Sequence, residues 1–151
     1  MANFCLASHT AALAEEVLRV GSKRFTESYI LGEIIRQSAA SFAKTEHRQG
    51  LGNTAIVFEA LKSGSIDVYP EYLGTIDLEI LKHNAPASLA QINRELAPLG
   101  LAAAIPLGFN NSYALAIRAA DVKHVALSNM SDLPRHTQLK LGLSHEFLGR
   151  S

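Results

Sequence analysis

Short apolar segments with the character of β-strands alternate along this chain with longer segments whose apolar residues recur at helical spacing. Residues 17–22 (VLRVGS) form the first strand-like run, and residues 26–41 show the first helical pattern. A chain that alternates in this way folds as an α/β domain around a mostly parallel sheet. This alternation is the strongest constraint that the sequence places on the fold.

Four helices are expected. In the first, Thr26 is the expected N-cap, with Phe25 and Ile30 packing across it. Asn53 is the expected cap of the second helix, which Gly64 ends. The third covers residues 72–83 and the fourth residues 86–96, with Ser88 as a cap. The expected inward residues are Ile30, Leu31, Ile34, Ile35 and Ala39 in the first helix and Ile56, Val57, Ala60 and Leu61 in the second.

Further strands are expected in the apolar runs that separate or follow these helices. Ligands of a parallel sheet bind beyond the carboxyl ends of its strands, beside helix N-termini. That rule directs attention to residues 22–23, 50–54, 69–75 and 109–113. The expected strands are residues 47–49, 66–69 (ended by Pro70), 101–107, 113–118 and 139–143.

Composition excludes several functional classes. The 151 residues are 48% apolar and 19% charged, which suits one globular core. Lys+Arg and Asp+Glu are both 14, and the longest basic cluster is Lys23-Arg24, so nucleic acid is not an expected partner. Hydrolase, Walker and dinucleotide motifs are absent, and the six histidines lack ligand spacing. We therefore expect neither an enzyme nor a metal or cofactor site.

The first fourteen residues (MANFCLASHTAALA) end in Ala12-Leu13-Ala14, a small-residue pattern typical of signal-peptide cleavage sites. They lack a basic start and a long apolar core, so an arbitrary extension is the other interpretation. The single cysteine, Cys5, follows a poor lipoprotein motif. A signal remnant would indicate a periplasmic or extracytoplasmic location.

Three of the four tyrosines, Tyr69, Tyr72 and Tyr113, lie where a strand is expected to meet a helix or turn. Pro70 fixes the backbone between the first two. Aromatic faces suit a trimethylammonium group, which has no N–H and attracts rings by about 0.5–2 kcal/mol each. The alternative is that these rings cover the core and leave a wet hydroxyl.

Four ordered blocks of the chain resemble the betaine, choline and proline-betaine binding proteins of osmoprotectant ABC importers. The resemblance extends from about Leu18 to the last residue. The blocks are residues 21–32 (GSKRFTE and YILG), 58–75 (FEALKSG and IDVYPEYLGT), 109–116 (FNNSYALA) and 141–150 (LGLSHEFLGR).

The resemblance implies a type II periplasmic-binding-protein fold, in which two α/β lobes close over a ligand. Residues 1–16 would be a signal remnant or extension, and residues 17–109 lobe one. Residues 110–151 would form the hinge crossover and the start of an incomplete lobe two. The chain would correspond to the N-terminal half of a member.

The resemblance also implies a binding site. Tyr72 and Tyr113 match cage tyrosines that face the quaternary ammonium, and Asn111 matches a residue that lines the cage. Lys23, Thr75 and Arg150 match groups that hold the solute's carboxylate end.

Each of these three polar residues has an alternative interpretation. Lys23 is then solvated, Thr75 only caps a helix, and Arg150 is a disordered residue next to the chain end. Tyr69 is expected to be structural rather than ligating.

The implied function is solute capture for an ABC importer of glycine betaine, choline or a similar compatible solute. Permease subunits in the membrane would be the protein partners. The alternative is a truncated fragment that does not bind solute or that self-associates through open sheet edges.

Overall fold

The computed structural model describes residues 16–121, 127–143 and 147 of the chain. Contacts between residues divide the chain into two compact units, Met1–Ala103 and Ala104–Ser151. Each unit is described by itself below. The first unit contains the sheet and most of the helices. The predicted site residues Lys23, Tyr72 and Thr75 also belong to it.

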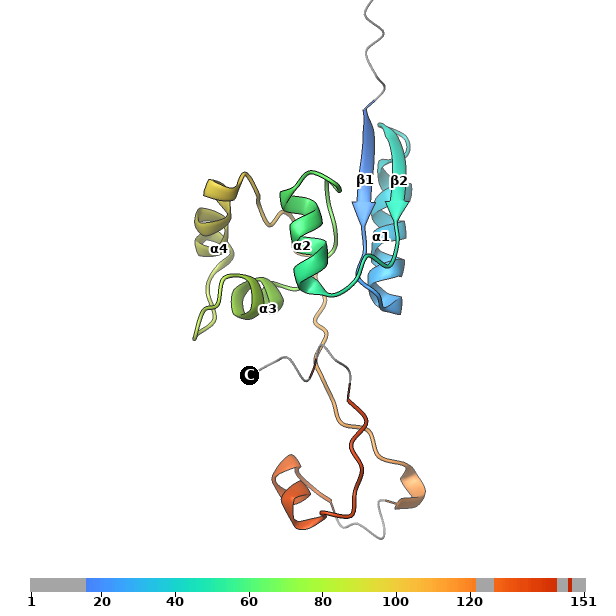
Figure 1. Cartoon of the computed structure of the whole chain (residues 1–151), viewed down its shortest axis with the longest axis vertical. Helices are drawn as coiled ribbons and strands as arrows, with labels where there is room; N and C mark the ends of the chain where they lie inside the picture. Colours follow the sequence, from blue (N-terminus) through green and yellow to red (C-terminus); the bar gives the residue numbers. More distant parts are fainter. Residues whose placement is uncertain (1–15, 122–126, 144–146, 148–151) are drawn as a thin grey trace, which may run out of the picture. The chain divides into compact units, whose positions relative to one another are not determined.

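The first unit contains a two-stranded parallel sheet. Strand β1 (Val17–Gly21) pairs in parallel with β2 (Lys44–Arg48), with Val20 opposite His47 (Figure 1). On its other side, Val20 forms an isolated parallel bridge with Val68. The predicted strand 66–69 is thus reduced to one bridging residue. Val20 lies between two neighbours and is fully buried, as expected for a central strand.

Helix α1 (Thr26–Ala39) packs its small residues against this sheet, which the apolar pattern did not predict. Ser28 and Gly32 are buried, whereas Ile30 and Ile34 are exposed. A Cβ added at Gly32 would lie 2.6 Å from His47 Nε2, so the helix approaches β2 too closely for larger side chains. The predicted inward face was therefore wrong at Ile30 and Ile34.

The predicted cap of α1 was also wrong. Phe25, with an extended backbone, is the N-cap residue and makes no side-chain capping bond. The hydroxyl of Ser28 instead accepts a hydrogen bond from the Lys23 backbone N–H at 2.8 Å. The helix therefore begins at Thr26, one residue earlier than a Thr26 cap would require, and its first turn holds the Lys23 backbone.

Helix α2 (Thr54–Lys62) has the predicted ends. The Asn53 side chain accepts from the Ile56 backbone N–H at 3.2 Å. Gly64 has φ of 71°, the left-handed conformation that follows many helix C-termini. Val57 is fully buried as predicted, but Ile56 is exposed, so the inward face is narrower than the pattern indicated.

The third predicted helix is irregular, and the fourth is regular. Helix α3 (Leu73–Thr75) runs into a π-helix, η1 (Ile76–Ile80). Helix α4 (Leu89–Leu96) begins at Ser88, whose side chain accepts from the Gln91 backbone N–H, as predicted. It continues into a 3₁₀ turn, η2 (Ala97–Leu99).

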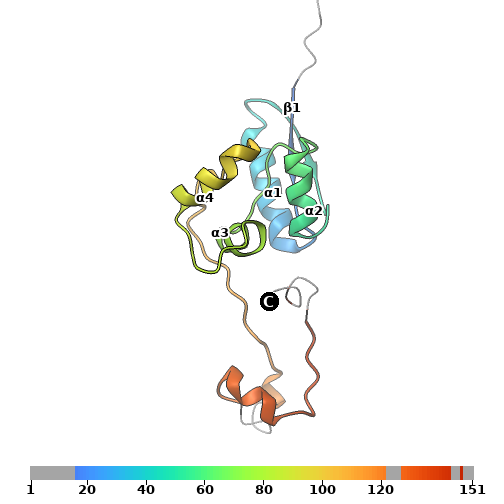
Figure 2. The same cartoon turned by 60° about the vertical axis from the view of Figure 1, so that its left-hand side comes forward.

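These helices share an apolar cluster. Ile76, Ile92 and Leu96 are buried together, with Phe58 of α2 packed against them. Figures 1 and 2 both show α3 between α2 and α4, in agreement with this cluster. The cluster fixes the segment that follows Tyr72 within the first unit.

The described residues of the second unit include the 3₁₀ segment η3 (Met130–Arg135) and a short helical segment at residues 119–121. Residues 101–107, 113–118 and 139–143 form no strand, so these three predictions were wrong. Residues 104–120 are all exposed. An extended segment becomes a strand only when a neighbouring segment pairs with its backbone, and apolar alternation alone does not supply that neighbour.

Candidate functional site

Lys23 is the second residue after β1, and its side chain is only 1% exposed. Its ammonium donates to Glu71 Oε1 at 2.7 Å and to Thr54 Oγ1 at 3.3 Å. The alternative in which Lys23 is solvated was therefore wrong. Three segments that are far apart in sequence meet at this amine: the end of β1, the start of α2 and the turn after Val68.

Glu71 lies in the turn formed by Tyr69, Pro70, Glu71 and Tyr72. The oxygen that accepts from Lys23 also accepts from the Tyr72 backbone N–H at 2.9 Å. Burial raises the pKa of the Tyr69 phenol, and the negative charge of Glu71 and a hydrogen bond to it raise the pKa further. One carboxylate therefore holds the lysine and two parts of the tyrosine turn.

Two aromatic rings lie beside the same ammonium. The Lys23 nitrogen is 5.5 Å from the centroid of the Phe25 ring and 5.5 Å from that of the Tyr72 ring. Both distances are within the range of cation–π attraction. The Tyr72 ring, predicted to face a cationic solute, thus already contacts a cation of the protein.

Thr75 is buried at the end of α3, and its backbone N–H donates to the Tyr72 carbonyl at 3.0 Å. It directly precedes η1, but its side chain makes no capping hydrogen bond there. The alternative role as a side-chain helix cap is therefore not supported by the structure.

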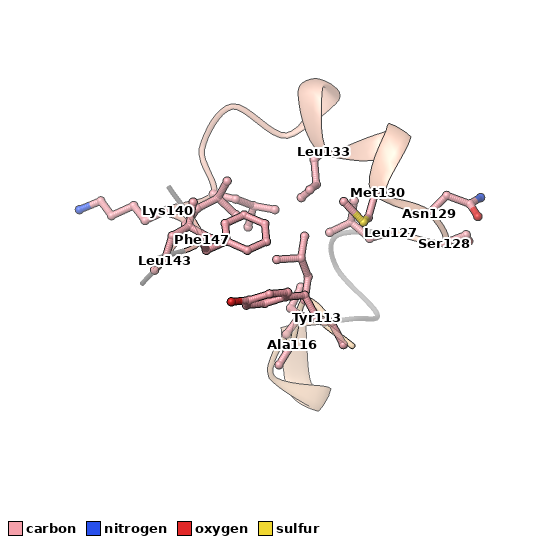
Figure 3. Close-up of a pocket in the computed structure, with 16 residues that line it drawn as sticks. Tyr113, Ala116, Leu127, Ser128, Asn129, Met130, Leu133, Lys140, Leu143 and Phe147 are labelled. Atoms are coloured by element: carbon pink, nitrogen blue, oxygen red, sulfur yellow. The ribbon is translucent and has the colours of Figure 1, made fainter. Parts of the chain in front are cut away.

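The other predicted site residues belong to the second unit or lie outside the described residues. Tyr113 is 53% exposed, and its ring contacts the Phe147 ring edge-on, with centroids 5.2 Å apart. Both rings line a largely apolar pocket of about 570 Å³ (Figure 3). Asn111 is exposed. Arg150 lies outside the described residues.

Residues 16–151 match the family described as the substrate binding domain of ABC-type glycine betaine transport systems. The match covers nearly the whole chain. The chain belongs to this family. The predicted resemblance is thereby confirmed, and the α/β architecture of the first unit fits a periplasmic-binding-protein fold.

Individual members of the family are similar to the chain over most of its length. A glycine-betaine-binding protein of Pseudomonas aeruginosa is 34% identical over 87% of the chain, and the glycine betaine-binding protein YehZ of Escherichia coli is 32% identical over 91%. The chain spans 44% and 49% of their lengths, about half of each.

Two further comparisons extend this result. The ergothioneine transport permease/ergothioneine binding protein EgtU of Helicobacter pylori is 31% identical over 92% of the chain, which covers 26% of that longer protein. The solved structure of apo YehZ from Escherichia coli superposes with a TM-score of 0.58 at 31% identity. That superposition covers 88% of this chain and 52% of the other.

Lys23 and the four residues around its ammonium are called the Lys23 cluster here: Phe25, Thr54, Glu71 and Tyr72. Sequence reasoning did not assign Phe25, Thr54 or Glu71 to the site. Thr54 and Glu71 lie in the ranges 50–54 and 69–75, to which the strand-end rule directs attention, but neither was singled out as a site residue, and Phe25 was expected only to pack across the start of a helix. Lys23 and Glu71 are 48 residues apart, so no local pattern connects them. The available signals were the strand-end rule, which indicated residues 22–23, 50–54 and 69–75 separately, and a carboxylate between two tyrosines at the end of an expected strand.

A serine, a histidine and a glutamate also lie in the order found in hydrolase triads. His47 Nε2 is 2.9 Å from Ser22 Oγ, and His47 Nδ1 is 3.3 Å from Glu33 Oε2. Ser22 is fully buried, so no substrate carbonyl can reach its hydroxyl. Hydrogen bonds from Arg36 and Gln37 lower the pKa of Glu33 to about 2. This arrangement joins α1 to the sheet and does not form an active site.

Neither a metal centre nor a membrane span is visible in the described part of the chain. No group of three or more His, Cys, Asp or Glu side chains there has an arrangement that holds a metal ion. No helix among residues 16–121, 127–143 and 147 is both long and apolar enough to cross a bilayer.

Proposed function

We propose that the chain forms part of an extracytoplasmic receptor that delivers a quaternary-ammonium compatible solute to an ABC importer. Glycine betaine is the first candidate solute, with choline or a similar compound as alternatives. The observation that carries this proposal is the Tyr72 ring, which lies 5.5 Å from a buried ammonium. A site that already holds a cation against an aromatic face has the chemistry that a methylated ammonium requires.

A trimethylammonium group presents methyl surface and diffuse positive charge, and it donates no N–H hydrogen bond. Aromatic rings attract such a group with about 0.5–2 kcal/mol each when water is excluded. Tyr72 and Tyr113 are the proposed cage rings, with Asn111 lining the cage. Several rings of this strength give a useful affinity without any hydrogen bond to the cation.

The carboxylate end of the solute has its own proposed partners. Lys23, Thr75 and Arg150 are assigned to it because ammonium, hydroxyl and guanidinium groups all donate to a carboxylate. In this proposal residues 17–109 form lobe one of a type II binding fold, residues 110–151 begin lobe two, and residues 1–16 are a signal remnant or extension. The permease subunits of the importer are the proposed protein partners.

A second candidate function is self-association without solute binding. Ile30 and Ile34 form an exposed apolar stripe on α1, and the nearby Phe42 is 89% exposed. Exposed apolar side chains at this density favour contact with another protein surface.

Calorimetric titration of two tyrosine variants tests the first proposal. Glycine betaine, choline, carnitine and ergothioneine would be titrated into the full chain. Tyr72→Ala should weaken binding about tenfold because a cation–π contact is lost, whereas Tyr72→Phe should bind as the wild type does because the ring face remains. Phe42→Ala removes an exposed ring elsewhere and serves as the control. A folded wild-type chain that gives heat with none of the four solutes would exclude the proposal.

A further inference from the structure

Glu71 connects the Lys23 ammonium to the segment that displays the Tyr72 ring. Its Oε1 atom accepts from the Lys23 ammonium at 2.7 Å and from the Tyr72 backbone N–H at 2.9 Å. Its side chain is 5% exposed, and that of Lys23 is 1% exposed. A buried carboxylate in this position fixes both the proposed anion-binding group and the turn that displays the proposed cage ring.

The same carboxylate determines the charge of the cluster. The positive charge of Lys23 and the negative charge of Glu71 cancel at 2.7 Å. A cationic solute against Tyr72 would lie near the Lys23 ammonium, which is 5.5 Å from that ring, and would be repelled by it. The charge of Glu71 offsets this repulsion, so a solute with net positive charge is tolerated.

We propose that Glu71 is a positioning residue that holds Lys23 and the Tyr72 turn and sets the net charge of the solutes that the site accepts. With Glu71 ionised, the site accepts both a zwitterion and a cation. Without that charge, nothing offsets the repulsion between Lys23 and a cationic solute. A zwitterionic solute loses less affinity, because its carboxylate can pair with Lys23. This inference rests on the proposed function, because it assigns selectivity to the same site.

The test compares choline, a cation, with glycine betaine, a zwitterion, by calorimetric titration of the wild type and of Glu71→Gln. Glutamine keeps the size of the side chain and removes its charge. Choline should bind about tenfold more weakly to the variant, as expected for an unbalanced like charge within about 6 Å, and glycine betaine should change by less than about threefold. Glu59→Gln removes a carboxylate that pairs with Lys62 on the surface and should leave both affinities unchanged.

Equal weakening of both solutes by Glu71→Gln in a folded protein would overturn the selectivity claim, because a purely structural role affects both alike. A second variant covers the case in which Glu71→Gln does not fold. The double variant Lys23→Met/Glu71→Gln leaves no ionised group at either position. The ratio of choline affinity to glycine betaine affinity should be higher in this variant than in the wild type, since glycine betaine loses its Lys23 partner while choline loses only a repulsion that Glu71 had offset. An unchanged ratio would overturn the claim.

Lysine labelling decides the positioning claim independently of any solute. Reductive methylation of the full chain, read by mass spectrometry, should leave Lys23 protected in the wild type and modified in Glu71→Gln. Lys62, which is exposed, should react equally in both proteins and serves as the internal control. Wild-type protein that binds neither solute would contradict the proposed function alone. Lys23 that reacts as fast as Lys62 in the wild type, or stays equally protected in both proteins, would overturn the positioning role.

Discussion

Lys23 and Glu71 form a pair whose members depend on each other. An ionised group that is almost completely buried is tolerated only when an opposite charge and hydrogen bonds replace its water. Lys23 has the Glu71 carboxylate, the Thr54 hydroxyl and two aromatic faces around it. Changing either charged residue alone therefore costs more than the pair itself contributes to folding.

Lys23→Met should destabilise the protein by about 3–5 kcal/mol, because it removes the ammonium that balances a buried carboxylate. Urea unfolding followed by circular dichroism measures this change in the free energy of unfolding. Lys23→Met/Glu71→Gln should recover part of the loss. Lys62→Met, in an exposed pair, should stay within about 0.5 kcal/mol of the wild type. If Lys23→Met unfolds with a free energy no lower than that of Lys62→Met, the prediction that Lys23 and Glu71 form a buried ion pair is contradicted.

His83 joins two helical elements of the first unit. Its Nδ1 is 2.6 Å from Asp77 Oδ1 on η1, and its Nε2 is 2.8 Å from Glu95 Oε2 on α4. Asp77 also accepts from the Ala87 backbone N–H at 2.9 Å, which holds the loop before α4. An imidazole between two carboxylates binds most strongly when it is protonated and both carboxylates are ionised.

The titration of these three groups predicts how stability depends on pH. Hydrogen bonds to Asp77 and then Glu95 raise the pKa of His83 above its ordinary 6.5. The stabilisation that protonated His83 gives to the folded state is therefore complete below pH 6.5 and is lost as pH rises through the raised pKa. The Ala87 N–H and then His83 lower the pKa of Asp77, and His83 and then Gln91 lower that of Glu95. Their contribution is lost as pH falls through those lowered values.

The difference in unfolding free energy between wild type and His83→Gln should therefore be largest at about pH 5–6 and should shrink toward pH 9. Thermal or urea unfolding across that range measures it. A difference between wild type and His83→Gln that stays constant from pH 5 to 9 would show that His83 acts without its charge.

At the scale of elements, local signals predicted the helix ends that depend on one residue. The Asn53 and Ser88 caps and the Gly64 terminus were predicted because each satisfies backbone groups within a few residues. The inward face of α1 was not predicted, because close approach to β2 selects Gly32 over larger apolar residues. The strands at 101–107, 113–118 and 139–143 failed for a related reason, since pairing depends on a partner that no local pattern specifies.

In the candidate site, too, the individual residues could be predicted from the sequence, but their long-range contacts could not. Lys23 and Tyr72 were predicted from a family resemblance and lie together in the structure. Their connection through Glu71 was not predicted, because it joins residues 48 positions apart. A buried ion pair is a property of tertiary structure, and the sequence alone shows only that both charges exist.

At the scale of the whole molecule, the exposed apolar side chains of α1 predict self-association. Light scattering after size exclusion should give a mass that rises above 16.3 kDa with protein concentration. Ile34→Lys should restore the monomer mass, because it places a charge in the exposed stripe of Ile30 and Ile34. Ala55→Lys adds the same charge at an exposed position of another helix, α2, and should leave the association unchanged. A monomer mass at every concentration would contradict this prediction.

The carboxylate at position 71 also determines what kind of event solute capture would be. An incoming glycine betaine molecule would find Lys23 already bonded to an internal carboxylate that resembles its own. Capture at that end would then be an exchange of one anion for another, with little net gain in enthalpy. Most of the driving force would have to come from the methylated end of the solute and from the release of water around it.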